Sequence, residues 1–267
     1  MRFIPTKEEL DVKYELYHVA IKALKRSKAP FLIGGAFALE HYTGITRWTK
    51  DLDIFVLPED FERVLEALSE VNCQVELTFP HWLGKAFCGE GHIDIIFNSG
   101  NGVCRVDNTW FENAPQVEIL NMIVKLIPPE EIIWSKSFIM ERERYDGADI
   151  MHILRACGKN LDWARLLNRF SSHWRILLSH LVLFGFIYPS ERSQVPDWVI
   201  NDLLSRLQND MENSPPADRV CKGTLLSRTQ YLVDIECWGY EDARLIPGGN
   251  LTREEIAHWT EAGKEEE

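Results

Sequence analysis

The first half of the chain alternates between two spacings of apolar residues. Short apolar or alternating runs predict strands at 31–33, 51–56, 74–78 and 92–97. Between these runs, apolar residues recur every three or four positions, which predicts helices at 6–27, 36–42 and 59–70. Because helices alternate with strands, the pattern predicts a domain of the α/β or α+β class.

Beyond residue 127 the pattern becomes helical. Helices are expected at 130–141, 146–157, 161–170, 173–186 and 196–207. The Pro128-Pro129 pair marks the change, because proline ends both helices and inner strands. The sequence therefore predicts a catalytic-type α/β domain over 1–127 and a mainly helical domain over 128–267.

Composition and charge narrow the classes of function. With 45% hydrophobic and 26% charged residues, the chain is neither disordered nor built of low-complexity sequence. Lys and Arg total 29 against 41 Asp and Glu, which gives a net charge of −12. Such a chain repels nucleic acid and anionic membranes overall. A polyanionic ligand is therefore expected to bind through a local basic patch or through metal ions.

Further sequence features address the cellular compartment. The apolar run 176–188 is interrupted by Ser179 and His180 and is too short to cross a bilayer. The first residues show no secretory signal, so we expect a cytoplasmic protein without membrane contact. The six cysteines form no CxxC pair, which predicts reduced thiols and no zinc site.

The stretch 31–56 and the strand 92–97 contain the candidate chemistry. Gly34-Gly35 follows a strand and begins a helix, where backbone N–H groups and the helix dipole favour a phosphate. Asp51 and Asp53 alternate on a strand, so both carboxylates project from one face. Asp94 is a lone acid between isoleucines, which is costly unless the carboxylate is paired or metal-bound. We expect Asp94 to join the first two acids as a third metal ligand.

In order and type, these residues resemble the nucleotidyltransferase superfamily of DNA polymerase β type. Gly34-Gly35, the Asp51-x-Asp53 pair and the later Asp94 match its pattern of glycines, helix, paired acids and third acid. The downstream residues resemble the abortive-infection toxin-like branch in Arg47-x-Thr49, Lys136, Arg142 and Asp146-x-x-Asp149. The resemblance covers roughly residues 30–155 and implies a small mixed-sheet core followed by a helical domain.

The resemblance also implies a mechanism. Asp51, Asp53 and Asp94 would bind two Mg²⁺ ions about 4 Å apart and an NTP such as ATP. Asp94 would help to take the proton of the acceptor hydroxyl. The nucleotide-binding residues implied are Gly34, Gly35, Arg47, Thr49 and Lys136. For Arg47 and Lys136 an ordinary surface role is an equal alternative.

The acceptor is left open by the sequence. Between residues 151 and 175 there are five basic residues and one acid, and Arg165 and Arg169 share a helix face. This strip is either an ordinary helix surface or a contact for RNA phosphates. Transfer to RNA in a toxin-antitoxin system would bring in a cognate regulatory protein. The alternatives are a catalytically silent binding or antitoxin-like module, and an enzyme that modifies a small molecule such as an aminoglycoside.

Overall fold

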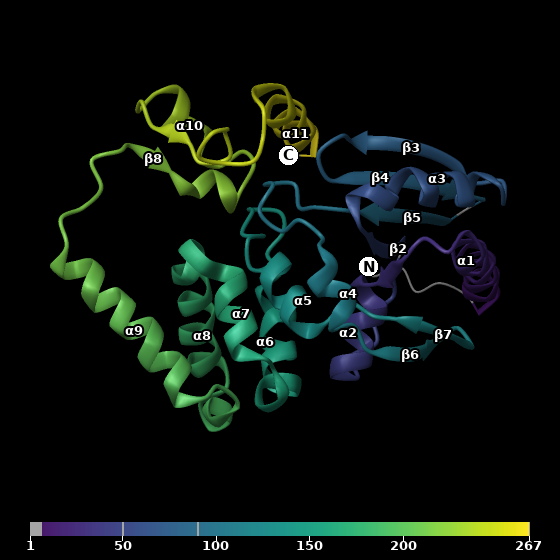
Figure 1. Cartoon of the computed structure of the whole chain (residues 1–267), viewed down its shortest axis with the longest axis horizontal. Helices are drawn as coiled ribbons and strands as arrows, with labels where there is room; N and C mark the ends of the chain where they lie inside the picture. The colour runs from purple at the N-terminus through teal and green to yellow at the C-terminus, as the bar shows by residue number, and fades with distance from the viewer. Residues whose placement is uncertain (1–6, 50, 90, 267) are drawn as a thin grey trace. The chain divides into compact units, whose positions relative to one another are not determined.

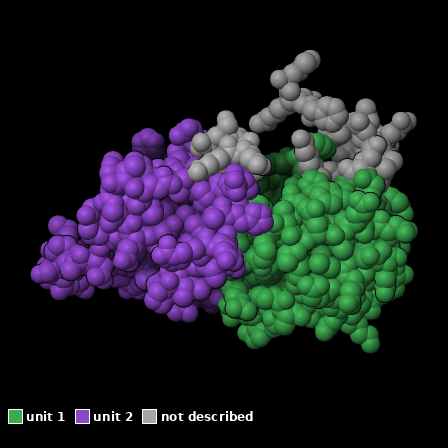
Figure 2. Space-filling view, turned by 90° about the horizontal axis from the view of Figure 1, so that it is seen from above, with its two compact units in different colours: residues 1–128 green, residues 129–267 purple. Residues whose placement is uncertain are grey.

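The chain folds into two compact units, Met1–Pro128 and Pro129–Glu267, which are coloured separately in Figure 2. The structure is a computed structural model that describes residues 7–49, 51–89 and 91–266. The first unit combines a sheet with helices, and the second is mainly helical (Figure 1). The predicted mixed α/β class is therefore confirmed.

A five-stranded mixed sheet forms the centre of the first unit. Its strands are β1 (Phe31–Ile33), β2 (Asp51–Val56), β3 (Gln74–Phe79), β4 (Leu83–Cys88) and β5 (Gly91–Ile96). They lie in the order β1-β2-β5-β4-β3. Only β2 and β5 run parallel, and the other three neighbours are antiparallel. Strand β4 was not expected, because Gly84 and Lys85 interrupt the apolar pattern on which the strand prediction depends.

One face of this sheet is apolar. On β2 and β5 the side chains of Leu52, Ile54, Ile93 and Ile95 are fully buried. Gly84 lies on the same face, and a Cβ there would lie 2.5 Å from the ring of Phe61 at the start of a helix. The apolar face is therefore packed, and the acids that alternate with these residues lie on the other face.

Helices and a hairpin complete the first unit. The helices are α1 (Lys7–Ser27), α2 (Gly35–Thr43), α3 (Phe61–Ser69) and α4 (Asn108–Glu112), and the hairpin strands are β6 (Gln116–Ile119) and β7 (Met122–Lys125). The first three agree with the helices predicted from apolar spacing. The hairpin was not predicted, because its two-residue loop, Leu120-Asn121, lacks the glycine that usually marks such a turn.

The second unit is built around α-helices. These are α5 (Pro129–Lys136), α6 (Gly147–Cys157), α7 (Trp163–Phe170), α8 (Trp174–Ile187), α9 (Asp197–Glu212), α10 (Leu232–Glu236) and α11 (Arg253–Glu266), with a small parallel pair β8 (Val220–Cys221) and β9 (Glu241–Asp242). Helix α5 ends earlier than expected, because the N–H of Met140 donates to the carbonyl of Leu226 and the chain leaves the helix. The stretch Trp163–Ile187 is long and apolar enough to cross a membrane, a test that core helices of soluble proteins also pass. Here it consists of two helices separated by a turn at Ser171–His173.

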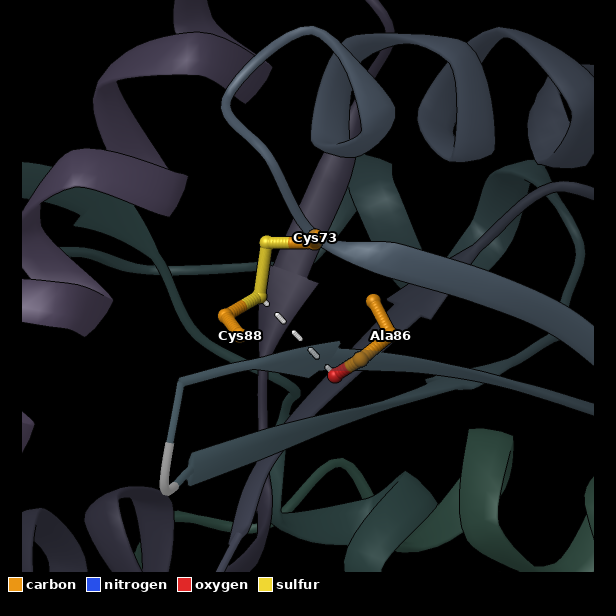
Figure 3. Close-up of a disulfide and its surroundings, with 3 residues drawn as sticks. All are labelled: Cys73, Ala86 and Cys88. Atoms are coloured by element: carbon orange, nitrogen blue, oxygen red, sulfur yellow. Dashed lines mark hydrogen bonds between the residues drawn. A yellow bond between two sulfur atoms is a disulfide. The ribbon is translucent and has the colours of Figure 1, made fainter.

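The prediction of six reduced cysteines is wrong for two of them. Cys73 and Cys88 form a disulfide, with their Cα atoms 4.4 Å apart (Figure 3). The antiparallel pairing of Gln74 with Phe87 brings the next residues outward, Cys73 and Cys88, face to face. Sequence spacing could not reveal this pair because the register of two strands is a tertiary property.

Candidate active site

The three predicted acids meet where β2 and β5 pair in parallel. Asp53 lies opposite Asp94, and Asp51 lies opposite His92. Because side chains alternate along a strand, all four of these project from the face opposite the buried leucine and isoleucines. The expectation that Asp94 lies beside the paired acids is met by this register.

The donor atoms of this group are close enough to bind one cation. Asp51, His92 and Asp94 each offer a ligand atom, and these atoms lie within 4.8 Å of one another. The Nε2 atom of His92 lies 3.7 Å from Oδ2 of Asp51. Two carboxylates and one imidazole fit a divalent cation, since carboxylates suit Mg²⁺ or Mn²⁺ and imidazole suits transition metals. The strand pattern alone did not predict His92 as a metal ligand.

Asp53 packs against Gly34 and Gly35. The N–H of Gly34 donates to the carbonyl of Asp53 at 2.9 Å. Gly35 has a φ of +54°, and a Cβ there would lie 1.8 Å from Oδ2 of Asp53. A Cβ on Gly34 would lie 2.3 Å from the ring of Phe55. The two glycines therefore let the first turn of α2 approach β2, so that the Asp53 carboxylate lies at the start of that helix.

The loop before β2 orients Asp51. The hydroxyl of Thr49 donates to Oδ1 of Asp51 at 2.5 Å. Thr49 thus holds a carboxylate in position, which differs from the nucleotide contact that the resemblance implied. Arg47 is exposed on the same loop. Nucleotide contacts of either residue stay a prediction.

A lysine that the sequence did not single out lies beside the acids. Lys85 on β4 is the register partner of Asp94, and its Nζ lies 3.9 Å from Oδ1 of Asp94. On β3, Glu76 pairs with Lys85. A row of charged residues therefore crosses the sheet from Asp53 through Asp94 and Lys85 to Glu76, in which Lys85 lies between two acids. The missed strand β4 explains why this row was not foreseen.

Tyr17 is a second residue that the sequence did not reveal. It is fully buried on α1 and its ring packs edge-on against Phe37 of α2. Burial, followed by the negative charges of Asp51 and Asp53, raises the pKa of Tyr17 above its usual value. The phenol therefore stays protonated beside the acids. A tyrosine on an amphipathic helix gives no sequence signal of such a position.

The downstream motif residues gather in the second unit. The Nζ atom of Lys136 lies 2.5 Å from Oδ2 of Asp146 and 3.0 Å from Oδ2 of Asp149. Arg144 also pairs with Asp146, whereas Arg142 is exposed. Burial acts to raise the pKa of Asp146, but hydrogen bonds and charge from Arg144 and Lys136 outweigh it and hold that pKa below its usual value. Lys136 thus has two acidic partners, and its role toward a nucleotide stays a prediction.

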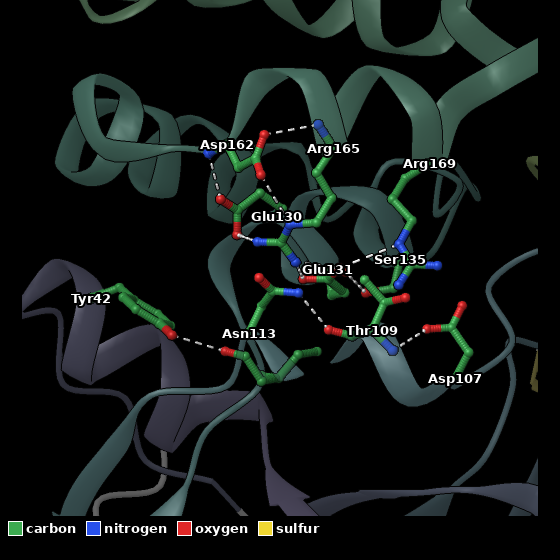
Figure 4. A network of polar contacts seen from close by, with 11 residues as sticks. Tyr42, Asp107, Thr109, Asn113, Glu130, Glu131, Ser135, Asp162, Arg165 and Arg169 are labelled. Carbon is green, nitrogen blue, oxygen red and sulfur yellow. Dashed lines mark hydrogen bonds and ion pairs between the residues drawn. The ribbon is translucent and has the colours of Figure 1, made fainter. Parts of the chain in front are cut away.

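Two arginines of the basic strip, Arg165 and Arg169, are paired with buried acids. Arg165 lies 2.5 Å from Glu130 and donates to both carboxylate oxygens of Glu131, at 2.8 and 2.9 Å (Figure 4). Arg169 contacts Glu131 at 3.3 Å and stacks over the ring of Trp134. Both arginine side chains are almost buried, with 13% and 12% exposed. Because both guanidinium groups are already paired with acids, these contacts argue against an RNA-binding role for Arg165 and Arg169.

Comparisons with known proteins give similarity at the level of solved structures. No protein-family model matches the chain, and no curated protein matches it. The antibiotic-resistance factor ANT(2'')-Ia is 18% identical, with a TM-score of 0.47 over 64% of this chain and 97% of its own. The lincosamide antibiotic adenylyltransferase LnuA, bound to lincomycin, is 16% identical, with a TM-score of 0.38 over 55% of this chain and 96% of its own.

A third solved structure shows a similar degree of likeness. An antigenic nucleotidyltransferase-like protein from Paracoccidioides brasiliensis is 13% identical, with a TM-score of 0.37 over 63% of this chain and 92% of its own. Since all three TM-scores lie below 0.5, the function proposed below rests on side-chain geometry.

Proposed function

We propose that this protein is a metal-dependent nucleotidyltransferase that moves a nucleoside monophosphate from an NTP to an acceptor hydroxyl. The observation that supports this most is the convergence of Asp51, Asp53 and Asp94 on one face of two parallel strands. The positive φ of Gly35 adds a backbone that a phosphate can approach closely, beside the same acids. A chain of net charge −12 needs such a combination to bind a triphosphate.

The residues of this face have distinct parts in the proposed reaction. Asp51, Asp53 and Asp94 would hold two Mg²⁺ ions through their carboxylate oxygens, and the imidazole of His92 would add a ligand for a transition metal. A cation bound there polarises phosphoryl oxygens and lowers the pKa of a bound hydroxyl. The N–H groups at the start of α2 donate to phosphate oxygens, and Thr49 keeps Asp51 oriented.

Asp94 accepts the proton in this scheme. The acceptor oxygen forms its bond to the α-phosphorus while the bond from that phosphorus to the β-bridging oxygen breaks, and pyrophosphate leaves. Asp94 takes the proton of the attacking hydroxyl, and Lys85 stabilises the carboxylate between turnovers from its position 3.9 Å away.

For the acceptor we propose a small cationic molecule that offers a hydroxyl, as an aminoglycoside does. The net charge of −12 attracts such a molecule, and Arg165 and Arg169, one of whose alternative roles was an RNA contact, are paired with Glu130 and Glu131. Transfer to RNA by a toxin-like enzyme with a regulatory partner is the competing outcome of the experiment.

One labelling experiment tests both parts of the proposal. The purified protein is incubated with Mg²⁺, a cell extract and each α-³²P-labelled NTP in turn, and the label is sorted into RNA, protein and small molecules. We expect label in the small-molecule fraction with at least one NTP. Label in RNA would support the activity and overturn the proposed acceptor.

Two variants make the result specific. Asp53→Asn should reduce transfer at least about 10³-fold, because it removes a carboxylate from the metal site while the buried neighbours Leu52 and Ile54 keep the strand packed. Glu62→Gln changes an exposed acid on α3 and should leave transfer unchanged. If wild type transfers no more label than Asp53→Asn with every NTP, the protein is a silent binding module.

A further inference from the structure

A large cavity lies within the second unit, and the proposed nucleotidyl transfer makes no use of it. Its volume is about 1020 Å³, and its lining includes Lys222, Leu225, Leu232, Arg244, Ile256 and Thr260. These residues come from the segment after β8, from α10, from the loop after β9 and from α11. Cavities of this size hold small organic ligands.

Arg244 is the unusual member of the lining. It is 1% exposed, although arginine is seldom buried without full pairing. Its Nε and Nη2 atoms donate to the carboxylate of Asp242, at 3.0 and 2.7 Å. Within the described part of the chain, its Nη1 atom has no hydrogen-bond partner. One edge of a buried guanidinium therefore keeps its hydrogen-bonding capacity.

Thr260 adds a second polar group with open capacity. It lines the same cavity and is 8% exposed, and its Oγ1 has no hydrogen-bond partner among the described residues. Much of the remaining lining is aliphatic, including Leu225, Leu232 and Ile256. The guanidinium of Arg244 and the hydroxyl of Thr260 can donate to a carboxylate, and the aliphatic side chains can pack against a hydrocarbon group attached to it.

The charges of the lining limit the ligand to one negative group. Asp242 already balances Arg244, and the remaining charged residues are two cations, Lys222 and Arg253, against three glutamates. Burial, followed by the charge of Lys222, lowers the pKa of His173, which is therefore neutral at pH 7. A polyphosphate would meet an excess of acid, whereas a single carboxylate needs only the open edge of Arg244.

We propose that this cavity binds a small organic monocarboxylate, with its carboxylate on Arg244 and its hydrocarbon part against Leu225, Leu232 and Ile256. Arg244 favours a negatively charged group, and the aliphatic side chains favour a hydrocarbon chain. Acetate lacks the hydrocarbon chain and a neutral alcohol lacks the charge, so neither meets both requirements. The site is separate from the acids of β2 and β5, because every residue that lines it belongs to the second unit.

The test compares three ligands with the same chain length on the full-length protein. Hexanoate, hexan-1-ol and hexylamine are titrated while the labelled methyl groups of leucine are followed by NMR. We expect the Leu225 and Leu232 signals to shift with hexanoate, which should bind at least about tenfold more tightly than hexan-1-ol. Hexylamine should bind no better than the alcohol. Equal affinity for acid and alcohol, or unmoved Leu225 and Leu232 signals, would overturn the proposal.

Paired variants assign the preference to Arg244. The double variant D242N/R244M removes both ions together and leaves no stranded charge, and in it the tenfold preference for hexanoate should fall to about one. Asp242→Asn alone keeps the guanidinium and frees two further donors, so hexanoate should bind at least as tightly as to wild type. A preference that persists in the double variant contradicts the assignment. If the double variant does not fold, the wild-type ratio and the leucine shifts decide.

Discussion

Gly35 shows how one residue limits the whole site. Its φ of +54° is strained for any side chain, and its missing Cβ is the space that the Asp53 carboxylate occupies. Gly44, at the other end of α2, has a φ of +69° but no atom within 4 Å of an added Cβ. Substitutions at the two glycines therefore distinguish two effects. Both introduce backbone strain, and only the one at Gly35 displaces Asp53.

Gly35→Ala and Gly44→Ala should differ in activity more than in stability. Both variants should lose about 1–2 kcal/mol in the free energy of unfolding from the positive φ, with a further loss for Gly35→Ala from the clash. Only Gly35→Ala should lose nucleotidyl transfer, because only there must the carboxylate of Asp53 move. Urea unfolding and the labelling assay measure the two effects. Equal activity of the two variants would contradict the assigned role of Gly35.

Asp146 gives a pH-dependent contribution to stability. Its folded pKa lies below its usual value, so its stabilising effect is complete above the pKa of the unfolded residue, about 3.9, and is lost as the pH falls through the lower folded pKa. At pH 7, Asp146→Asn should lower the free energy of unfolding by about 1.5–3 kcal/mol, the range for hydrogen bonds to charged groups.

The difference in the free energy of unfolding between wild type and Asp146→Asn should therefore become smaller as the pH falls. Urea unfolding at pH 7, 4 and 3 should show the full difference at pH 7, a smaller one near pH 4 and the smallest at pH 3. Glu143→Gln, an exposed acid in the same segment, should show no such trend. A difference that stays constant over this range would mean that Asp146 is not held by Lys136 and Arg144 as an ion.

At the scale of elements, α5 and α7 are joined by a buried ion network. Arg165→Met should cost about 3–5 kcal/mol, because Glu131 is fully buried and would lose its bidentate partner. Arg206→Met on α9 removes a half-exposed pair with Asp202 one turn away and should cost about 0.5 kcal/mol. Denaturant unfolding measures both values. Similar costs for the two arginines would show that the α5–α7 network contributes no more than a surface pair.

The β3–β4 hairpin is closed by the Cys73–Cys88 disulfide. The two cysteines are 15 residues apart, for which loop closure corresponds to about 3 kcal/mol. Dithiothreitol should lower the free energy of unfolding of wild type by about that amount and leave C73S/C88S unchanged. Thiol titration of the denatured protein should give four free thiols before reduction and six after it. Six thiols in the freshly isolated protein would fit the predicted cytoplasmic location and contradict the disulfide.

What the sequence could predict follows from the range of the interactions involved. Strand β2 and the acids Asp51 and Asp53 were predictable, because strand alternation and the preceding glycines are local signals. The partnership of Lys85 with Asp94, and of Cys73 with Cys88, depends on strand register, which no local pattern specifies. The ion pairs of Arg165 could not be predicted either, because its partners Glu130 and Glu131 precede it by more than thirty residues.

At the scale of the whole molecule, net charge decides which acceptors approach. With a charge of −12 and the Arg165–Arg169 pair neutralised, we expect no saturable binding of a 20-nucleotide RNA at about 50 mM salt. For a cationic acceptor, KM should instead rise with ionic strength, because screening weakens its attraction to the chain. Filter binding and a salt series of the transfer assay measure the two quantities on the same preparation. Saturable RNA binding whose affinity falls steeply with log[salt] would contradict this prediction. For single strands, each phosphate contact makes the plot of log K against log[salt] steeper by about 0.7.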